Sequence, residues 1–130
     1  MKKPIYVEVA PGELIDKITI LEIKLERIRE EKKLVNIRIE LKALVEARDS
    51  SINYGPKLES LSAELKFANE ALWEIEDNIR DFEREKNFGN DFVELARSVY
   101  VTNDKRARLK RQINELLGSC IIEEKSYTNY

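Results

Sequence analysis

The sequence predicts an all-α fold, a three-helix antiparallel bundle with a very long first helix, and three observations carry this prediction. An apolar seven-residue repeat runs from Leu58 to Phe82 in alternating steps of three and four, which is typical of lengthwise, coiled-coil-like helix packing. Charged residues make up 37% of the chain, and glycine and proline are scarce, as in long helices with solvated faces. Clusters of turn-forming residues such as Asn and Gly occur at only two internal places, which leaves three helical stretches.

The first helix is expected from about residue 11 to about residue 48. Pro11 suits a first helical turn, and Glu13 and Asp16 complement the positive end of the helix dipole. Two apolar stripes follow, which indicate two packing neighbours. At about 1.5 Å per residue this helix would be about 57 Å long, more than a compact domain of this size requires.

Two shorter helices are expected after it. The loop at 49–56 carries the Asn, Gly and Pro residues of a helix–helix turn, and the second helix follows over about 57–86. The break at 87–90 ends that helix, and the third runs over about 91–117. Because short turns make consecutive helices antiparallel, the third helix should run parallel to the first.

Both chain ends carry short β-prone segments. Residues 5–9 alternate in the manner of a strand, and the run Cys120 to Ile122 opens a polar tail over 119–130. With the third helix parallel to the first, Cys120 should lie far from Val9. The two segments would then pair through the tail or between subunits. We expect a single helical domain over 1–130.

Composition excludes several classes of function. The net charge is −2, so nothing global attracts nucleic acid or anionic lipid. The chain has no histidine and only Cys120 as a thiol, which excludes His-based catalysis, thiol-ligated metals and intrachain disulfides. No apolar run approaches the roughly 20 residues of a membrane span. We expect a cytoplasmic protein without cofactor, metal or membrane contact.

The third helix contains the candidate binding residues. Its apolar seam is interrupted at 102–106 by residues that include weak helix formers. One interpretation is a pocket for a ligand or partner, and the other is a buried polar layer that fixes helix register. The residues expected to converge there are Arg97, Tyr100, Asn103, Asp104 and Arg106.

The same helix carries a basic stretch. Six basic residues against the single acid Asp104 could contact a phosphate backbone or an anionic metabolite. The end of the second helix is acidic and should pack beside this stretch, so internal pairing is expected to leave only weak nucleic-acid binding. The basic residues are Arg97, Lys105, Arg106, Arg108, Lys110 and Arg111.

Two families of helical enzymes share features with the chain. Carboxylates at helical spacing are similar to those of all-helical nucleotide pyrophosphohydrolases, although the ordered pair of acidic motifs is not found. The opening of the first helix resembles the small helical chorismate mutases, which also form intertwined dimers. There, however, Gly12 and Glu40 stand at or close to positions where that family requires cations. No catalytic residue or metal ligand is assigned.

A closer resemblance covers nearly the whole chain. It rests on the blocks PGELIDKITILEIK at 11–24, LWEIED at 72–77, LARSVY-x-TND at 95–104 and EEKSY at 123–127. These blocks resemble a small bacterial and phage-associated family known only as a domain of unknown function. The resemblance implies no activity, but it places emphasis on 100–104 and on the tail.

The sequence therefore favours a non-enzymatic helical interaction protein that self-associates as a homodimer and offers its polar band and tail to an unidentified protein partner. Part of the stripe Leu34, Ile37, Leu41 and Leu44 should stay uncovered in a monomer. The alternative is a small-molecule site, enzymatic or regulatory, in which Arg97, Arg106 and Asp104 bind an anionic ligand. Complete pairing of these arginines with carboxylates of the first or second predicted helix favours the first interpretation, and a pocket open to solvent beside Arg97 and Arg106 favours the second.

Overall fold

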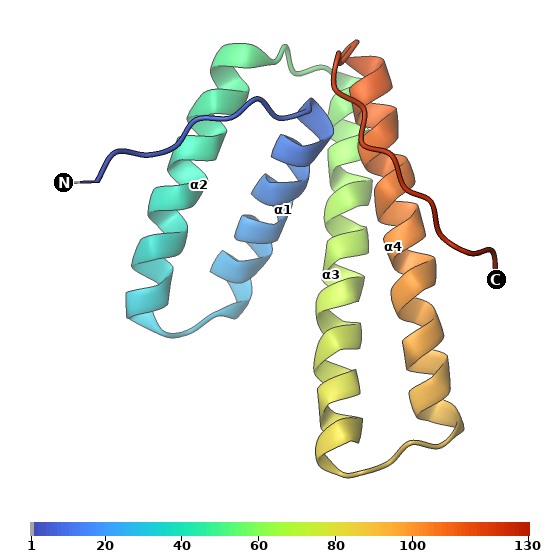
Figure 1. The fold of residues 1–130 in the computed structure, drawn as a ribbon. Coiled ribbons are helices and arrows are strands. Elements are labelled where there is room, and N and C mark those ends of the chain that lie inside the picture. Colours follow the sequence, from blue (N-terminus) through green and yellow to red (C-terminus); the bar gives the residue numbers. More distant parts are fainter. Residues whose placement is uncertain (1) are drawn as a thin grey trace.

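The computed structural model describes residues 2–130, and their regular structure is entirely helical. The helices are α1 (Pro11–Arg27), α2 (Glu31–Ser51), α3 (Pro56–Arg84) and α4 (Asn90–Leu116). Figure 1 shows them as two hairpins that stand side by side, α1 with α2 and α3 with α4. None of these helices is both long and apolar enough to cross a membrane.

The prediction of three helices with a single first helix over 11–48 is wrong. The backbone becomes extended at Ile28 (φ −81°, ψ 138°) and again at Glu30 (φ −71°, ψ 118°), so four helices form. Neither Gly nor Pro marks the break, and Arg29 and Glu30 are good helix formers. The reversal lays α2 back along α1. Packing between the two helices therefore outweighs local propensity.

The predictions for the chain ends are also wrong. Residues 2–10 and 119–130 contain no strand. The extra reversal makes α1 antiparallel to α4, not parallel, and brings the start of α1 to the end of α4, where the Gly12 N–H donates to Asn114 Oδ1 at 2.7 Å. Ala10 and Glu123 line one small cavity there, so the two terminal segments leave the helices at the same end of the molecule.

The predicted bounds of the last two helices agree with the structure within two residues. Gly89 is extended just before α4, and Lys86 adopts a positive φ of 58° just after α3. The apolar repeat packs α3 against α4. The repeat is buried at Leu58, Leu65 and Ala68 but only half-buried from Leu72 to Phe82, where the hairpin extends beyond the other two helices (Figure 1).

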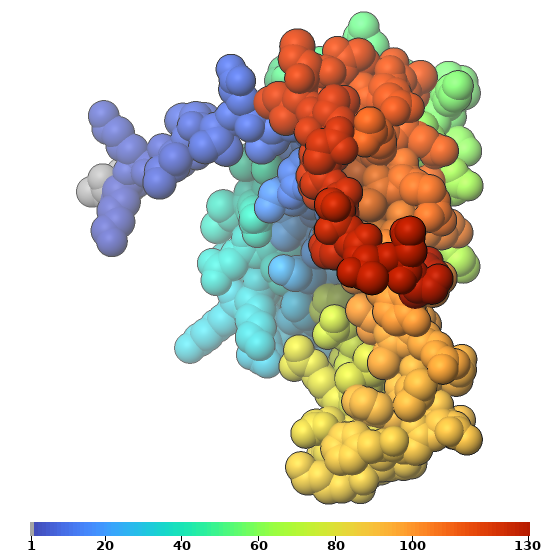
Figure 2. Space-filling model, turned by 45° about the vertical axis from the view of Figure 1, so that its right-hand side comes forward, coloured from blue at the N-terminus to red at the C-terminus, as the bar shows by residue number. Residues whose placement is uncertain are grey.

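The core is small and lies at one end of the α3–α4 hairpin. It forms where α1 meets the first half of α3 and the second half of α4, and its buried members are Ile15, Leu58, Leu65, Ala68, Leu109 and Ile113. Helix α2 packs on α1 alone and buries only Ile37. Figure 2 shows the hairpin tip and the N-terminal arm projecting from the main body.

The accessible surface reflects this open shape. It amounts to 9650 Å², whereas a compact monomer of 15.2 kDa exposes about 7100 Å². The extended ends contribute part of the excess, and the one-sided contacts of α2 and of the hairpin tip contribute the rest.

Candidate functional site

A buried ionic network joins three helices at the edge of the core. Asp16 of α1 is 1% exposed, and the Arg106 guanidinium of α4 donates from Nε and Nη2 to its two carboxylate oxygens at 2.9 and 2.5 Å. The Asn69 amide of α3 donates to Asp16 Oδ1 and to Thr19 Oγ1, both at 2.9 Å. Contacts between residues 90 positions apart thereby fix how α1 sits on the hairpin.

The network keeps both partners charged. Burial alone would raise the pKa of Asp16, but hydrogen bonds from Arg106 and Asn69, together with the positive charges of Arg106 and Lys110, outweigh burial and lower that pKa. The hydrogen bond to Asp16 outweighs desolvation and raises the pKa of Arg106. Both groups are therefore ionised at neutral pH.

A second ionic cluster ties α1, α4 and the tail together. Lys110 Nζ donates to Glu13 Oε2 at 2.7 Å and to Glu123 Oε2 at 3.1 Å. Burial would lower the pKa of Lys110, but these two hydrogen bonds outweigh it and raise that pKa. Arg111 pairs with Glu124 of the tail in the same way, at 3.4 Å. Three of the six basic residues, Arg106, Lys110 and Arg111, are thus paired with α1 or the tail, whereas the sequence predicted neutralisation by the second predicted helix, now α3.

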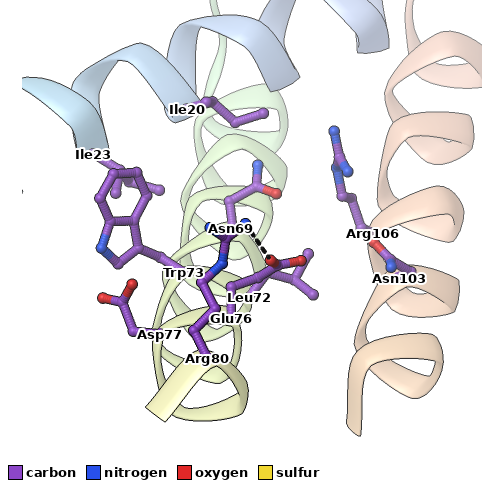
Figure 3. Close-up of a pocket in the computed structure, with 10 residues that line it drawn as sticks. All are labelled: Ile20, Ile23, Asn69, Leu72, Trp73, Glu76, Asp77, Arg80, Asn103 and Arg106. Atoms are coloured by element: carbon purple, nitrogen blue, oxygen red, sulfur yellow. Dashed lines mark ion pairs between the residues drawn. The ribbon is translucent and has the colours of Figure 1, made fainter. Parts of the chain in front are cut away.

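A cavity of about 520 Å³ lies beside the Asp16 network, between α1, α3 and α4 (Figure 3). Its polar inner end is formed by Asn69, Asn103 and Arg106. Its other end carries Trp73 and three charged residues of α3. The three charged residues are Glu76, Asp77 and Arg80, and the remaining lining residues are Ile20, Ile23 and Leu72.

The structure separates the residues that the sequence grouped into one site. Arg106 and Asn103 line the cavity described above, whereas Tyr100 and Asp104 lie beneath the C-terminal tail. Arg97 is exposed and pairs with Glu94 of its own helix at 2.5 Å. Only Asn103 lines both cavities.

The tail covers the second face of the polar band. A space of about 820 Å³ lies between α4 and residues 125–130. The Tyr130 ring lies 4.8 Å from the Tyr100 ring, centroid to centroid, and a hydrogen bond with Asp104 raises the pKa of Tyr130. Part of the predicted binding residues therefore hold the chain's own end.

Sequence reasoning missed the central members of the network. Asp16 was assigned to the helix dipole, although a carboxylate directly after Leu14 and Ile15 and two residues before Ile18 is a signal of a buried charge. Asn69 gave no signal, because it lies beside the repeat and not in it. The partners lie up to 90 residues apart, and no local pattern connects them.

Comparison with known proteins yields one finding. The sequence model of a family described as a family of unknown function (DUF6165) matches residues 5–130. No curated protein and no solved structure matches the chain significantly. The match includes all four helices and the tail, and its description names no substrate, partner or cofactor.

Proposed function

The chain belongs to this family of unknown function, DUF6165, and we propose that it is a non-enzymatic helical interaction protein that self-associates as a homodimer. The observation that supports the proposal is the accessible surface, which exceeds that of a compact monomer by on the order of 2500 Å². A stable interface between two proteins buries about 1600 Å² in total, so the open surface is large enough for one.

The outer face of α2 is the proposed dimer surface. This helix packs on α1 alone, and Val35 and Ile39 are 46% and 65% exposed one helical turn apart. Of the stripe predicted to stay uncovered, Ile37 is buried against α1, and Leu34, Leu41 and Leu44 are half-buried, so the exposed pair lies outside that stripe. A second copy of α2 would give the two exposed side chains an apolar neighbour.

The proposal has finer parts that rest on the sequence. It includes coiled-coil-like packing of α3 on α4 in the hairpin tip, a cytoplasmic location and an unidentified protein partner for the polar band and tail. It also includes the bacterial and phage association of the family. Half-buried apolar side chains along the hairpin tip support the first of these parts.

Sedimentation equilibrium at micromolar concentration tests the dimer. The wild-type chain should sediment as a dimer, and the double variant Val35→Lys, Ile39→Lys should be monomeric with unchanged helicity, because charges there cannot enter an apolar interface. Phe67→Lys is the matched control, since Phe67 on α3 is 68% exposed and lies outside α2. A monodisperse wild-type monomer would overturn the proposal. If the control variant dissociates as well as the double variant, the outer face of α2 is not the specific dimer surface.

An anionic-ligand site at the two arginines has less support. Arg106 already has a bidentate carboxylate partner in Asp16, and Arg97 has Glu94. A bound anion would have to displace or share these carboxylates. The pairing of Arg106 with Asp16 of α1 favours the interaction protein, whereas Arg97 pairs only within α4 and Arg106 also lines an open cavity, which favour a ligand site.

A further inference from the structure

We propose that the cavity between α1, α3 and α4 binds a small organic cation. Its ammonium or guanidinium group would lie between Trp73 and Asp77, and its other end would hydrogen bond to Asn69 and Asn103. Figure 3 shows Trp73 and Asp77 at one end of the cavity and Asn103 and Arg106 at the other. The site does not depend on self-association, which is proposed for α2.

The charges around the cavity select a cation. Arg106 is neutralised by Asp16, and Arg80 lies 3.8 Å from Glu76. Asp77 lines the same cavity and makes no ion pair within residues 2–130. The cavity is therefore left with one unpaired carboxylate, which attracts a cation and repels an anion.

Trp73 supplies the second contact for such a group. Trp73 and Asp77 are one turn apart on α3, so their side chains project from the same face of the helix. Ile23 of α1 lines the same cavity as the indole (Figure 3). An indole face next to a carboxylate attracts organic cations through both the ring quadrupole and the negative charge.

The inner end of the cavity holds a buried amide with an unused acceptor. Asn69 is 6% exposed, and its Nδ2 donates to Asp16 and Thr19. Its Oδ1 accepts no hydrogen bond from residues 2–130. Every fully enclosed side-chain oxygen of these residues has a hydrogen-bond partner, so this oxygen, which has none, is open to solvent. Buried amides normally use their oxygen, and a ligand N–H would satisfy it. Asn103, across the cavity on α4, adds a donor and an acceptor that residues 2–130 leave free (Figure 3).

The dimensions and lining fit an elongated amine. About 520 Å³ lies within the range of about 300–1000 Å³ typical of small-molecule sites. Between the two polar ends, Leu72 and Ile20 offer an apolar wall for a methylene chain. Agmatine, with a guanidinium, four methylenes and an amine, has this pattern of groups and is a suitable probe.

Trp73 reports on this site directly, because it is the only tryptophan in the chain. Titration of the full chain with agmatine should produce a saturable change in tryptophan emission, and glutarate, a dianion of similar length, should produce none. Asp77→Asn should weaken the apparent affinity for agmatine about tenfold. Asp81→Asn is the matched control, since Asp81 is one turn further along α3, pairs with Arg84 and lies outside the cavity.

Three results would overturn the proposal. They are no saturable response to agmatine at millimolar concentration, an equal response to glutarate, and identical affinities of the Asp77→Asn and Asp81→Asn variants. Both carboxylates are exposed, so neither variant should unfold, and circular dichroism verifies this. Loss of agmatine binding would leave the sedimentation result unchanged, so the two proposals fail separately.

Discussion

Helices α1 and α2 follow each other in the chain and would pass for one helix by sequence, yet they differ sharply in burial. Eight of the 17 residues of α1 are buried, whereas only one of the 21 residues of α2 is. α1 packs on all three other helices, and α2 packs on α1 alone. In this molecule, the number of neighbouring helices, more than the share of apolar residues, decides how much of a helix is buried.

The buried residues of α1 are also chemically mixed. Gly12, Asp16 and Thr19 lie among its buried aliphatic side chains, and two of them bind partners on α3 or α4 through side chains. The single buried residue of α2 is Ile37. Position and orientation of α1 are therefore set by specific polar contacts, while α2 is held by apolar packing alone.

Matched carboxylate deletions in the two helices should give the largest difference. Asp16→Ala should lower the free energy of unfolding by about 3 kcal/mol, because it leaves the half-buried Arg106 unpaired. Glu31→Ala removes the partner of Arg38 on the exposed face of α2 and should change that free energy by less than about 0.5 kcal/mol. Urea unfolding measures both changes. Equal losses of unfolding free energy in the two variants would show that α1 and α2 do not differ in this way.

Glycine positions give the next largest contrast. A Cβ at Gly12 would clash with the Lys110 carbonyl oxygen and lie 2.9 Å from Asn114 Oδ1, so Gly12→Ala should cost about 1–3 kcal/mol of unfolding free energy. Gly55, in the loop after α2, has nothing within 4 Å of such an atom and an extended backbone. Gly55→Ala should stabilise by about 0.4–1 kcal/mol, and thermal unfolding distinguishes the two directions.

Acid should weaken the attachment of α1 selectively. The folded-state pKa of Asp16 is lower than its usual 3.8, so its contribution to stability is complete above about pH 4 and is lost as the pH falls through the folded-state pKa. The difference in unfolding free energy between wild type and Asp16→Asn should therefore be constant from pH 7 to about pH 4 and shrink below it. Urea unfolding across this range measures the difference, and a gap that persists into strong acid would contradict the assignment.

The smallest expected effect concerns nucleic acid. The acids of α1 and the tail neutralise Arg106, Lys110 and Arg111, so the basic stretch of α4 should bind duplex DNA or RNA only weakly. We expect that binding to disappear at physiological salt, where the Debye length is about 8 Å. Fluorescence anisotropy with a labelled duplex measures it, and submicromolar affinity at that salt would be the contrary result.

The sequence predicted the helical class and the α3–α4 hairpin because both depend on patterns of residues that lie close together in the chain. The seven-residue repeat and the Gly89 break lie within the elements they define, and their bounds agree with the structure within two residues. The break at 28–30 could not be predicted this way. Ile28, Arg29 and Glu30 carry no turn signal, and the reversal arises only because α2 packs back on α1.

The candidate site shows the same limit. The polar interruption of the last helix drew attention to Asn103 and Arg106, which do line the cavity between the helices. The interruption could not show that Arg106 points to Asp16 of α1, or that Tyr100 and Asp104 face the tail. Neighbours on one helix can face different partners, and only the path of the chain decides which.

The antiparallel contact between α1 and α4 also bears on how the chain folds. A ribosome completes α1 first, yet the partners of Gly12 and Asp16 on α4 lie 102 and 90 residues later. The hairpin of α3 and α4 closes over a few residues and can begin at its turn before the end of α4 has emerged, so it should start to form earlier than α1 docks on α4. Until residues 106 and 114 leave the exit tunnel, Asp16 lacks its arginine partner and Gly12 lacks its asparagine partner, so α1 can contact α2 and α3 in the nascent chain before it docks on α4.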